Sequence, residues 1–203
     1  STKDLVFKYL FPLVNIVQTS PQSYNLSAAA GNLSEEKIRN FQQLCSSFFR
    51  GIKLMCENST AGLQYLMVSL SLRLKNVLGL NSRRSNAIVF GFILRNSIIS
   101  ALDNVEESFG KLSIGKISRT SVRVLKNVAE ALKKLVNGLT FDSQSPGLNV
   151  PTLNTFLQNN FHLVEDFASV FQELYDKNAT MYSSVTPSTL AEEVGTFTEK
   201  DTE

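Results

Sequence analysis

Apolar residues recur at three- and four-residue spacing along almost the whole chain, which is the period of one face of an α-helix. No run of segments shows the two-residue alternation of half-buried strands, and no unit is repeated in tandem. The pattern therefore predicts an all-α fold, a single globular bundle of about five or six helices with a disordered C-terminal tail. At 203 residues the chain is long enough for one domain with a full core.

Capping residues and helix breakers divide this pattern into six predicted helices. They are expected at about 5–17, 34–56, 63–78, 82–109, 118–138 and 152–182. Pro12 should kink the first helix, and Asn32 with Glu35 has the spacing of a capping box for the second. Gly79 and Gly138 are suited to end the third and fifth helices. We expect the helical bundle domain to cover 1–183 and a disordered acidic tail to cover 184–203, because core residues are scarce after Pro187.

The core is predicted from the apolar stripe of each helix. The third helix, which consists mostly of Leu, Ser and Val, is expected to lie deep in the interior. The core-packing residues that we expect are Leu66, Leu70, Ile93, Leu102, Leu125, Leu132, Phe161, Phe167 and Phe171.

Charge and hydropathy narrow the range of partners. The net charge is +2, and the basic residues do not alternate with stacking aromatic residues, so no nucleic-acid partner is predicted. Lys8 and Pro12 interrupt the apolar N-terminal run, and no later run reaches about 18 residues without a charge, so no membrane span is predicted. Charged residues make up only 19% of the chain, and an uncharged polar coat of Ser, Thr, Asn and Gln must cover much of its surface.

Two cysteines, Cys45 and Cys56, fall within one predicted helix. On an unbroken helix they would lie about 16 Å apart, too far for a disulfide. An intramolecular bridge would require a bend near Gly51, and two buried thiols are the alternative. Glycosylation sequons permit secretion and begin at Asn25, Asn32, Asn58 and Asn178.

Several short motifs resemble catalytic or binding signatures without their required context. GKLSIGKIS at 110–118 has the skeleton of a phosphate-binding loop, but a helix precedes it and Ile117 occupies the place of the metal-binding hydroxyl. Ser34 with Lys37, and Ser113 with Lys116, have SxxK spacing without the accompanying motifs. His162 precedes Glu165 and Asp166 at the spacing of a surface ion pair.

The remaining titratable residues do not form a recognisable centre either. With one histidine and two cysteines, a transition-metal site would have to be assembled from carboxylates. Acidic pairs such as Glu35 and Glu36 are adjacent in sequence and point different ways around a helix. We therefore assign no catalytic, cofactor-binding or metal-ligating residue, and we predict that the chain is not an enzyme.

A succession of short motifs runs through the middle of the chain. FGKL at 109–112 is followed by Ile117, RVL at 123–125, NGL at 137–139 and GLNV at 147–150, and LGLNSRRSNAIVFGFI at 78–93 precedes them. From Leu63 to Val150 this order resembles the helical repeat units of spider silk proteins (spidroins), especially the aciniform and tubuliform types. The resemblance implies a soluble helical globule that is stored at high concentration and later assembles, and it implies no catalytic residue.

The expected function is thus a non-enzymatic structural module of a secreted silk-type protein, which supports storage and assembly into fibres. Its partners would be further copies of itself or other silk-type chains. The alternative is a helical carrier that binds lipids or other apolar ligands in a cavity lined by phenylalanines of the first, second and sixth helices. We predict a secreted, extracellular protein without a cofactor.

Overall fold

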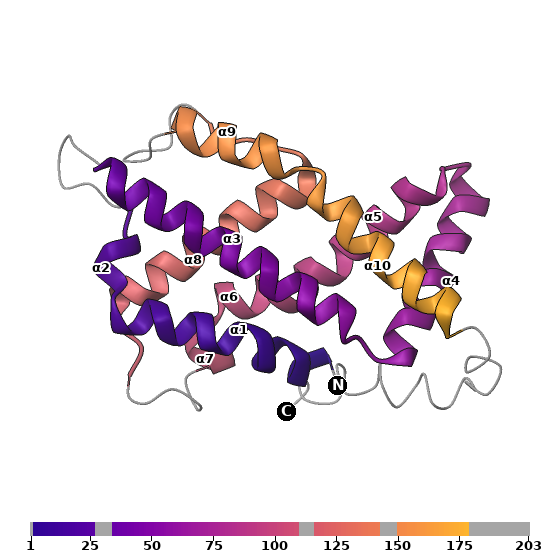
Figure 1. Cartoon of the computed structure of the whole chain (residues 1–203), viewed down its shortest axis with the longest axis horizontal. Coiled ribbons are helices and arrows are strands. Elements are labelled where there is room, and N and C mark those ends of the chain that lie inside the picture. The colour runs from indigo at the N-terminus through magenta and orange to yellow at the C-terminus, as the bar shows by residue number, and fades with distance from the viewer. Residues whose placement is uncertain (1, 27–33, 110–115, 143–149, 179–203) are drawn as a thin grey trace.

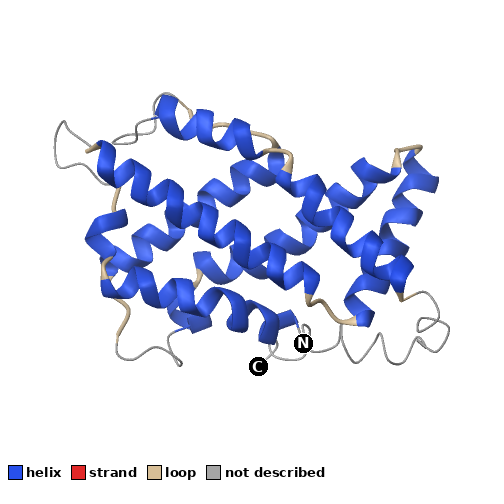
Figure 2. Ribbon diagram, in the orientation of Figure 1, coloured by secondary structure: helices blue, strands red, loops and turns tan. Residues whose placement is uncertain are grey.

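A computed structural model of the chain describes residues 2–26, 34–109, 116–142 and 150–178. These residues form an all-α globule, and Figure 2 shows helices and connecting loops but no strand in this part of the chain. The predicted fold class is therefore confirmed for the bundle. The tail expected at 184–203 lies outside the described residues.

The N-terminal half contains four helices, and three of them were predicted. They are α1 (Thr2–Thr19), α2 (Pro21–Tyr24), α3 (Glu35–Glu57) and α4 (Ala61–Leu78). Helix α1 continues through Pro12. The single turn of α2 falls in a segment that we expected to be a loop, and Pro21 begins it because the fixed φ of proline suits the first turn of a helix. Ser34, rather than Asn32, caps α3 by accepting a hydrogen bond from the Lys37 main-chain N–H at 3.3 Å.

The predicted fourth helix is divided into several pieces. These are α5 (Ser82–Leu94), a π-helical turn η1 (Arg95–Ile99), α6 (Ser100–Asp103) and α7 (Val105–Phe109). The Ser100 N–H donates to the Arg95 carbonyl, the wide bond that defines a π turn. The buried residues Phe90, Leu94, Ile98 and Leu102 are spaced four apart, slightly more than one α-helical turn. The π turn absorbs this excess and keeps all four side chains facing the core.

The C-terminal half contains α8 (Arg119–Asn137), α9 (Val150–Asn160) and α10 (Leu163–Lys177). Ser118 and Gly138 cap α8, and Gly138 has the left-handed φ of 62° that favours glycine. The predicted sixth helix is interrupted at Phe161 and His162, so that α9 packs on α8 and α3 while α10 packs on α5, α4 and α3. Figure 1 shows α9 and α10 lying one after the other along the same side of the molecule.

One hydrophobic cluster connects these helices, and phenylalanine rings fill much of it. The Phe109 ring meets Phe7 edge to face with centroids 5.4 Å apart, and it stacks against Phe11 at 6.3 Å. Phe49 stacks against Phe156 at 6.0 Å between α3 and α9. The aromatic residues that we expected to line a ligand cavity therefore contact one another within the bundle.

The predicted core residues have different environments in the structure. Five of them are buried, namely Leu102, Leu125, Leu132, Phe167 and Phe171. Ile93 and Phe161 are half-buried and pack against the core, and Leu66 is half-buried. Leu70 is 38% exposed, so its assignment to the core was wrong.

The error at Leu70 has a geometric cause. Helix α4 buries Leu63, Gln64, Met67, Val68 and Ser71, a face centred about 70° around the helix from the predicted leucine stripe, at 100° per residue. Only α5 and α10 pack closely against α4, at one end of the molecule, so α4 is not the deep core helix that we expected.

Candidate functional site

The α4–α5 hairpin projects at one end of the molecule (Figure 1). Its three-residue connection begins at Gly79, which ends α4 in the left-handed conformation at φ 64°. Asn81 begins α5 by accepting a hydrogen bond from the Arg84 N–H at 2.8 Å. The caps determine where the chain reverses, as the sequence predicted.

Small polar residues line the interface between the two hairpin helices. Ser71 and Ser85 are buried, the Ser71 hydroxyl hydrogen-bonds the Asn86 side chain, and the Ser85 hydroxyl donates to the Asn81 carbonyl at 3.0 Å. Buried hydroxyls need such partners, and small side chains allow the helices to approach closely. The buried side of α4 is therefore partly polar, and several of its leucine side chains lie on the exposed side of the helix.

Helix α10 holds the hairpin on the bundle through aromatic contacts. The Phe90 ring packs against Phe167 and Phe171 with centroid separations of 6.1 and 6.0 Å. Tyr65 of α4 meets Tyr175 at 6.5 Å. Both hairpin helices are thus in contact with α10, α5 through its middle turns and α4 through its last turn.

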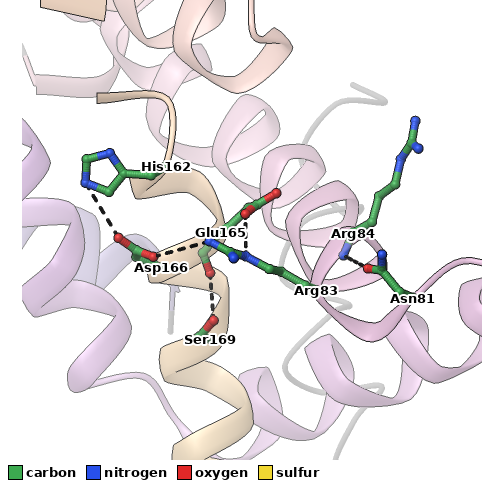
Figure 3. A network of polar contacts seen from close by, with 7 residues as sticks. All are labelled: Asn81, Arg83, Arg84, His162, Glu165, Asp166 and Ser169. Atoms are coloured by element: carbon green, nitrogen blue, oxygen red, sulfur yellow. Dashed lines mark hydrogen bonds and ion pairs between the residues drawn. The ribbon is translucent and has the colours of Figure 1, made fainter. Parts of the chain in front are cut away.

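A polar network joins the start of α5 to the start of α10 (Figure 3). Arg83 pairs with Glu165 and lies 4.0 Å from Asp166, measured from Nη2 to Oδ1. The His162 Nε2 lies 3.7 Å from the Asp166 Oδ2, the i, i+4 contact predicted from the sequence. These side chains are exposed, so each pair is worth about 1 kcal/mol or less.

The network does not place a nucleophile next to the histidine. The Ser169 hydroxyl donates to the Glu165 carbonyl at 2.8 Å, and Figure 3 shows it turned away from the imidazole. A hydroxyl nucleophile must be within hydrogen-bond reach of its base. The arrangement is that of an ion-pair bridge between two helices.

Exposed apolar side chains are concentrated on the hairpin. Among the described residues, six of the nine large hydrophobic side chains that are exposed belong to α4 or α5, namely Leu70, Leu72, Val77, Leu78, Ile88 and Phe92. Val77 is 74% exposed and Leu78 is 59% exposed. Isolated exposed leucines are ordinary, but their gathering on one projecting element is typical of an interaction surface.

A shallow groove of about 340 Å³ runs along α5. Its lining runs from Arg84 of α5 to Arg95 at the start of η1, and also includes Val136 and Asn137 of α8 and Val164 of α10. Its lining contains two arginines and no carboxylate. Ile88 and Phe92 lie between the two arginines, and Phe92 is 65% exposed.

The sequence prediction missed this hairpin surface because it assigned the leucines of α4 to the core. A signal was available in the pattern itself. Leu72 lies on the opposite side of the helix from the stripe that contains Leu63, Leu70 and Leu74, so α4 carries apolar side chains on more than one face. Such a helix either is buried on all sides or presents an apolar face to a partner.

The two cysteines are free thiols in the structure. Helix α3 is unbroken from Glu35 to Glu57, so the bend that a bridge requires near Gly51 does not occur. Both thiols are buried, and burial raises the pKa of Cys45 and Cys56 well above the ordinary value of 9.0, since desolvation disfavours the thiolate. Of the two alternatives, the buried thiols are found.

The other motifs serve as helix caps where they are described. Ser118, at the end of the phosphate-loop skeleton, accepts a hydrogen bond from the Ser121 N–H at 3.0 Å, and Ser34 of the first SxxK pair also caps a helix. The second pair begins at Ser113, outside the described residues. Within the described ranges, no group of three His, Cys, Asp or Glu residues could hold a metal ion.

In the part of the chain that the structure describes, one helical stretch, Ser82–Asp103, is long and apolar enough to cross a membrane by length and hydropathy alone. Of its most apolar window, 44% is buried inside the protein, and a core helix of a water-soluble protein passes the same test. This is weak support for a span, although the sequence analysis had found no candidate.

Comparison with known proteins does not place the chain in a family. No protein-family model matches it, and no curated protein is significantly similar to it.

Proposed function

We propose that this chain is a non-enzymatic structural module of a secreted silk-type protein, and that it self-associates through the exposed apolar surface of the α4–α5 hairpin. The observation that carries the proposal is the concentration of exposed large hydrophobic residues on that hairpin. The resemblance to spidroin repeats from Leu63 to Val150 also supports it, because that range includes all but the first two residues of the hairpin.

The energetics of the hairpin favour association at high concentration. Fully burying a valine or leucine side chain stabilises a complex by about 1.5–3 kcal/mol. Val77 and Leu78 are the last two residues of α4, next to the turn of the hairpin, and both are exposed to a second molecule. Two such side chains give only weak association, which suits a protein that stays soluble while dilute and assembles when concentrated.

The test combines native mass spectrometry and circular dichroism over a range of concentrations, with and without shear. We expect helical monomers at low concentration, and oligomers followed by β-rich assemblies at high concentration under shear. The double substitution Val77→Asp with Leu78→Asp should raise the concentration needed for association about tenfold or more. Leu54→Asp on α3 is the matched control, since Leu54 is also exposed but lies off the hairpin.

Two results would contradict this function. If the hairpin variant and the control associate like the unmodified chain, the hairpin is not the contact surface. If the protein stays monomeric at every concentration and under shear, the structural role is wrong. A small molecule that co-purifies at fixed stoichiometry would instead support the carrier, but the ring-to-ring packing of the phenylalanines provides no observation in its favour.

A further inference from the structure

The order of charged and apolar side chains along the α5 groove indicates which kind of ligand it can bind. Arg84, Ile88, Phe92 and Arg95 are spaced four, four and three residues apart and therefore follow one face of the helix. Two cations are separated by an apolar centre over about 16 Å of helix. A complementary ligand has carboxylates at its two ends and apolar side chains between them.

The two arginines retain capacity to bind carboxylates. Among the described residues, no carboxylate forms an ion pair with the Arg84 guanidinium, and Figure 3 shows it pointing away from the network that Arg83 forms. The Arg95 Nη2 donates to the neutral Asn137 Oδ1 at 2.8 Å, which leaves most of its five donors available. Arginine binds carboxylates with two parallel hydrogen bonds, so both positions are suited to acidic side chains.

The floor of the groove is firm because two helices approach closely beneath it. A Cβ added to Gly91 would lie 2.8 Å from the Val136 Cγ1, so Gly91 of α5 packs directly against the Val136 side chain of α8. The π turn begins at Arg95, at one end of the groove, and π turns are frequent at functional sites. An extended peptide can therefore bind along α5 without requiring the bundle to move.

We propose that this groove docks the chain's own acidic segment 191–201, which reads AEEVGTFTEKD. Glu193 and Glu199 flank Val194 and Phe197, the same order of charged and apolar groups with the opposite sign. In an extended peptide these two glutamates lie about 20 Å apart, close to the span between the arginines.

The length of chain after α10 permits this docking. Helix α10 ends at Lys177, and its first turn, which includes Val164, borders the groove about 20 Å away along the helix axis. The 14 steps from Asn178 to Glu192 can reach about 46 Å when extended. Tethering gives the segment an effective concentration near millimolar, which favours docking within one molecule over capture from another.

The experiment uses the full-length chain with a nitroxide at Thr198→Cys and isotope labelling for NMR. Cys45 and Cys56 are buried, so the introduced thiol is labelled selectively, and the unmodified chain put through the same labelling checks this. We expect the amide signals of Ile88 and Phe92 to broaden far more than those of α2, which lies at the opposite end of the molecule in Figure 1.

Charge reversal tests whether the arginines are responsible. Arg84→Glu with Arg95→Glu should reduce the docked population about fivefold, and adding Glu193→Arg with Glu199→Arg should restore it. Arg83→Glu is the matched control: its guanidinium faces Glu165 and Asp166, so docking should not change.

Three outcomes would overturn the proposal. Broadening on α5 no greater than on α2 means that the segment is elsewhere. Broadening that survives the charge reversal means that the arginines do not hold it. Broadening that appears only when spin-labelled chains are mixed with separate isotope-labelled chains means that the groove binds the segment of a second copy.

Discussion

Gly91 of α5 packs closely against Val136 of α8. We therefore predict that Gly91→Ala destabilises the unmodified protein but stabilises a variant in which Val136 has been shortened. A Cβ at Gly91 would meet the Val136 Cγ1 at 2.8 Å, closer than carbon atoms pack in proteins. Valine in a helix has one strongly preferred rotamer, so Val136 cannot turn aside without strain. The contact must be relieved by moving a helix.

Two opposing effects determine the result of Gly91→Ala. Overpacking costs about 1–3 kcal/mol, whereas replacing glycine by alanine within a helix stabilises by about 1 kcal/mol. Gly91→Ala should therefore destabilise the protein by about 1 kcal/mol. In a Val136→Ala background the obstructing methyl group is gone, and the same change should stabilise it by about 1 kcal/mol.

Urea unfolding of the four proteins, followed by circular dichroism at 222 nm, measures this cycle. The expected coupling between the two positions is about 2 kcal/mol, well above the 0.3–0.5 kcal/mol scatter of independent sites. If Gly91→Ala has the same sign and size in both backgrounds, the helices do not approach as described. The dependence of the unfolding free energy on urea concentration should be the same for all four proteins, so that differences in midpoint report differences in stability alone.

Three further predictions concern the core, the cysteines and the connection before α9. Leu125→Asp should abolish cooperative melting because an unpaired buried charge costs several kcal/mol, whereas Leu70→Asp, at a site that is 38% exposed, should cost only about 1–2 kcal/mol and leave the transition cooperative. Cys45 and Cys56 should resist a thiol reagent at pH 8 until the protein unfolds. Their pKa is raised by burial, so unfolded thiols ionise near the ordinary value of 9.0 while folded ones stay protonated. Stability should therefore hold below pH 9 and fall above it, by about 1 kcal/mol per thiol at pH 10. Asn154→Ala should cost about 1–2 kcal/mol in urea unfolding, because the side chain makes two main-chain hydrogen bonds of 2.7 and 3.0 Å to the segment after α8.

Each of these three has a clear contrary result. A cooperative transition in the Leu125 variant would refute the assignment of Leu125 to the core. Loss of folding in the Leu70 variant would mean that the outer side of α4 is buried. Rapid labelling of either thiol in the folded protein, or a flat stability profile up to pH 10, would show that the thiols are accessible. If Asn154→Ala leaves the urea midpoint unchanged, the two hydrogen bonds of the Asn154 side chain do not contribute to stability.

Local signals predicted the helices wherever the cause of a boundary is itself local. Gly79 and Gly138 end helices because glycine adopts positive φ without strain, and Ser118 begins one through its own hydroxyl. The sequence did not predict the breaks at η1 and at Phe161, because no capping or helix-breaking residue marks them. They follow from the need to keep distant turns in contact with different neighbours.

The candidate site also has one feature that the sequence predicts and one that depends on packing. The presence of Arg84, Ile88, Phe92 and Arg95 on one helix face follows from periodicity alone, because a helix repeats every 3.6 residues. Whether that face lies in the core or in solvent depends on which helices pack against it, and this was misjudged for α4.

The sequence by itself determined that the described part of this protein is built from helices alone, where most of those helices begin and end, and that its two cysteines on one helix cannot pair without a bend. Those properties depend on neighbouring residues and on the covalent geometry of the backbone. Only the tertiary structure decided which side of α4 is covered, where α5 meets α8, and which apolar side chains face solvent. The physical reason is that burial is a property of pairs of helices, and an apolar residue is equally suited to a core and to an interface.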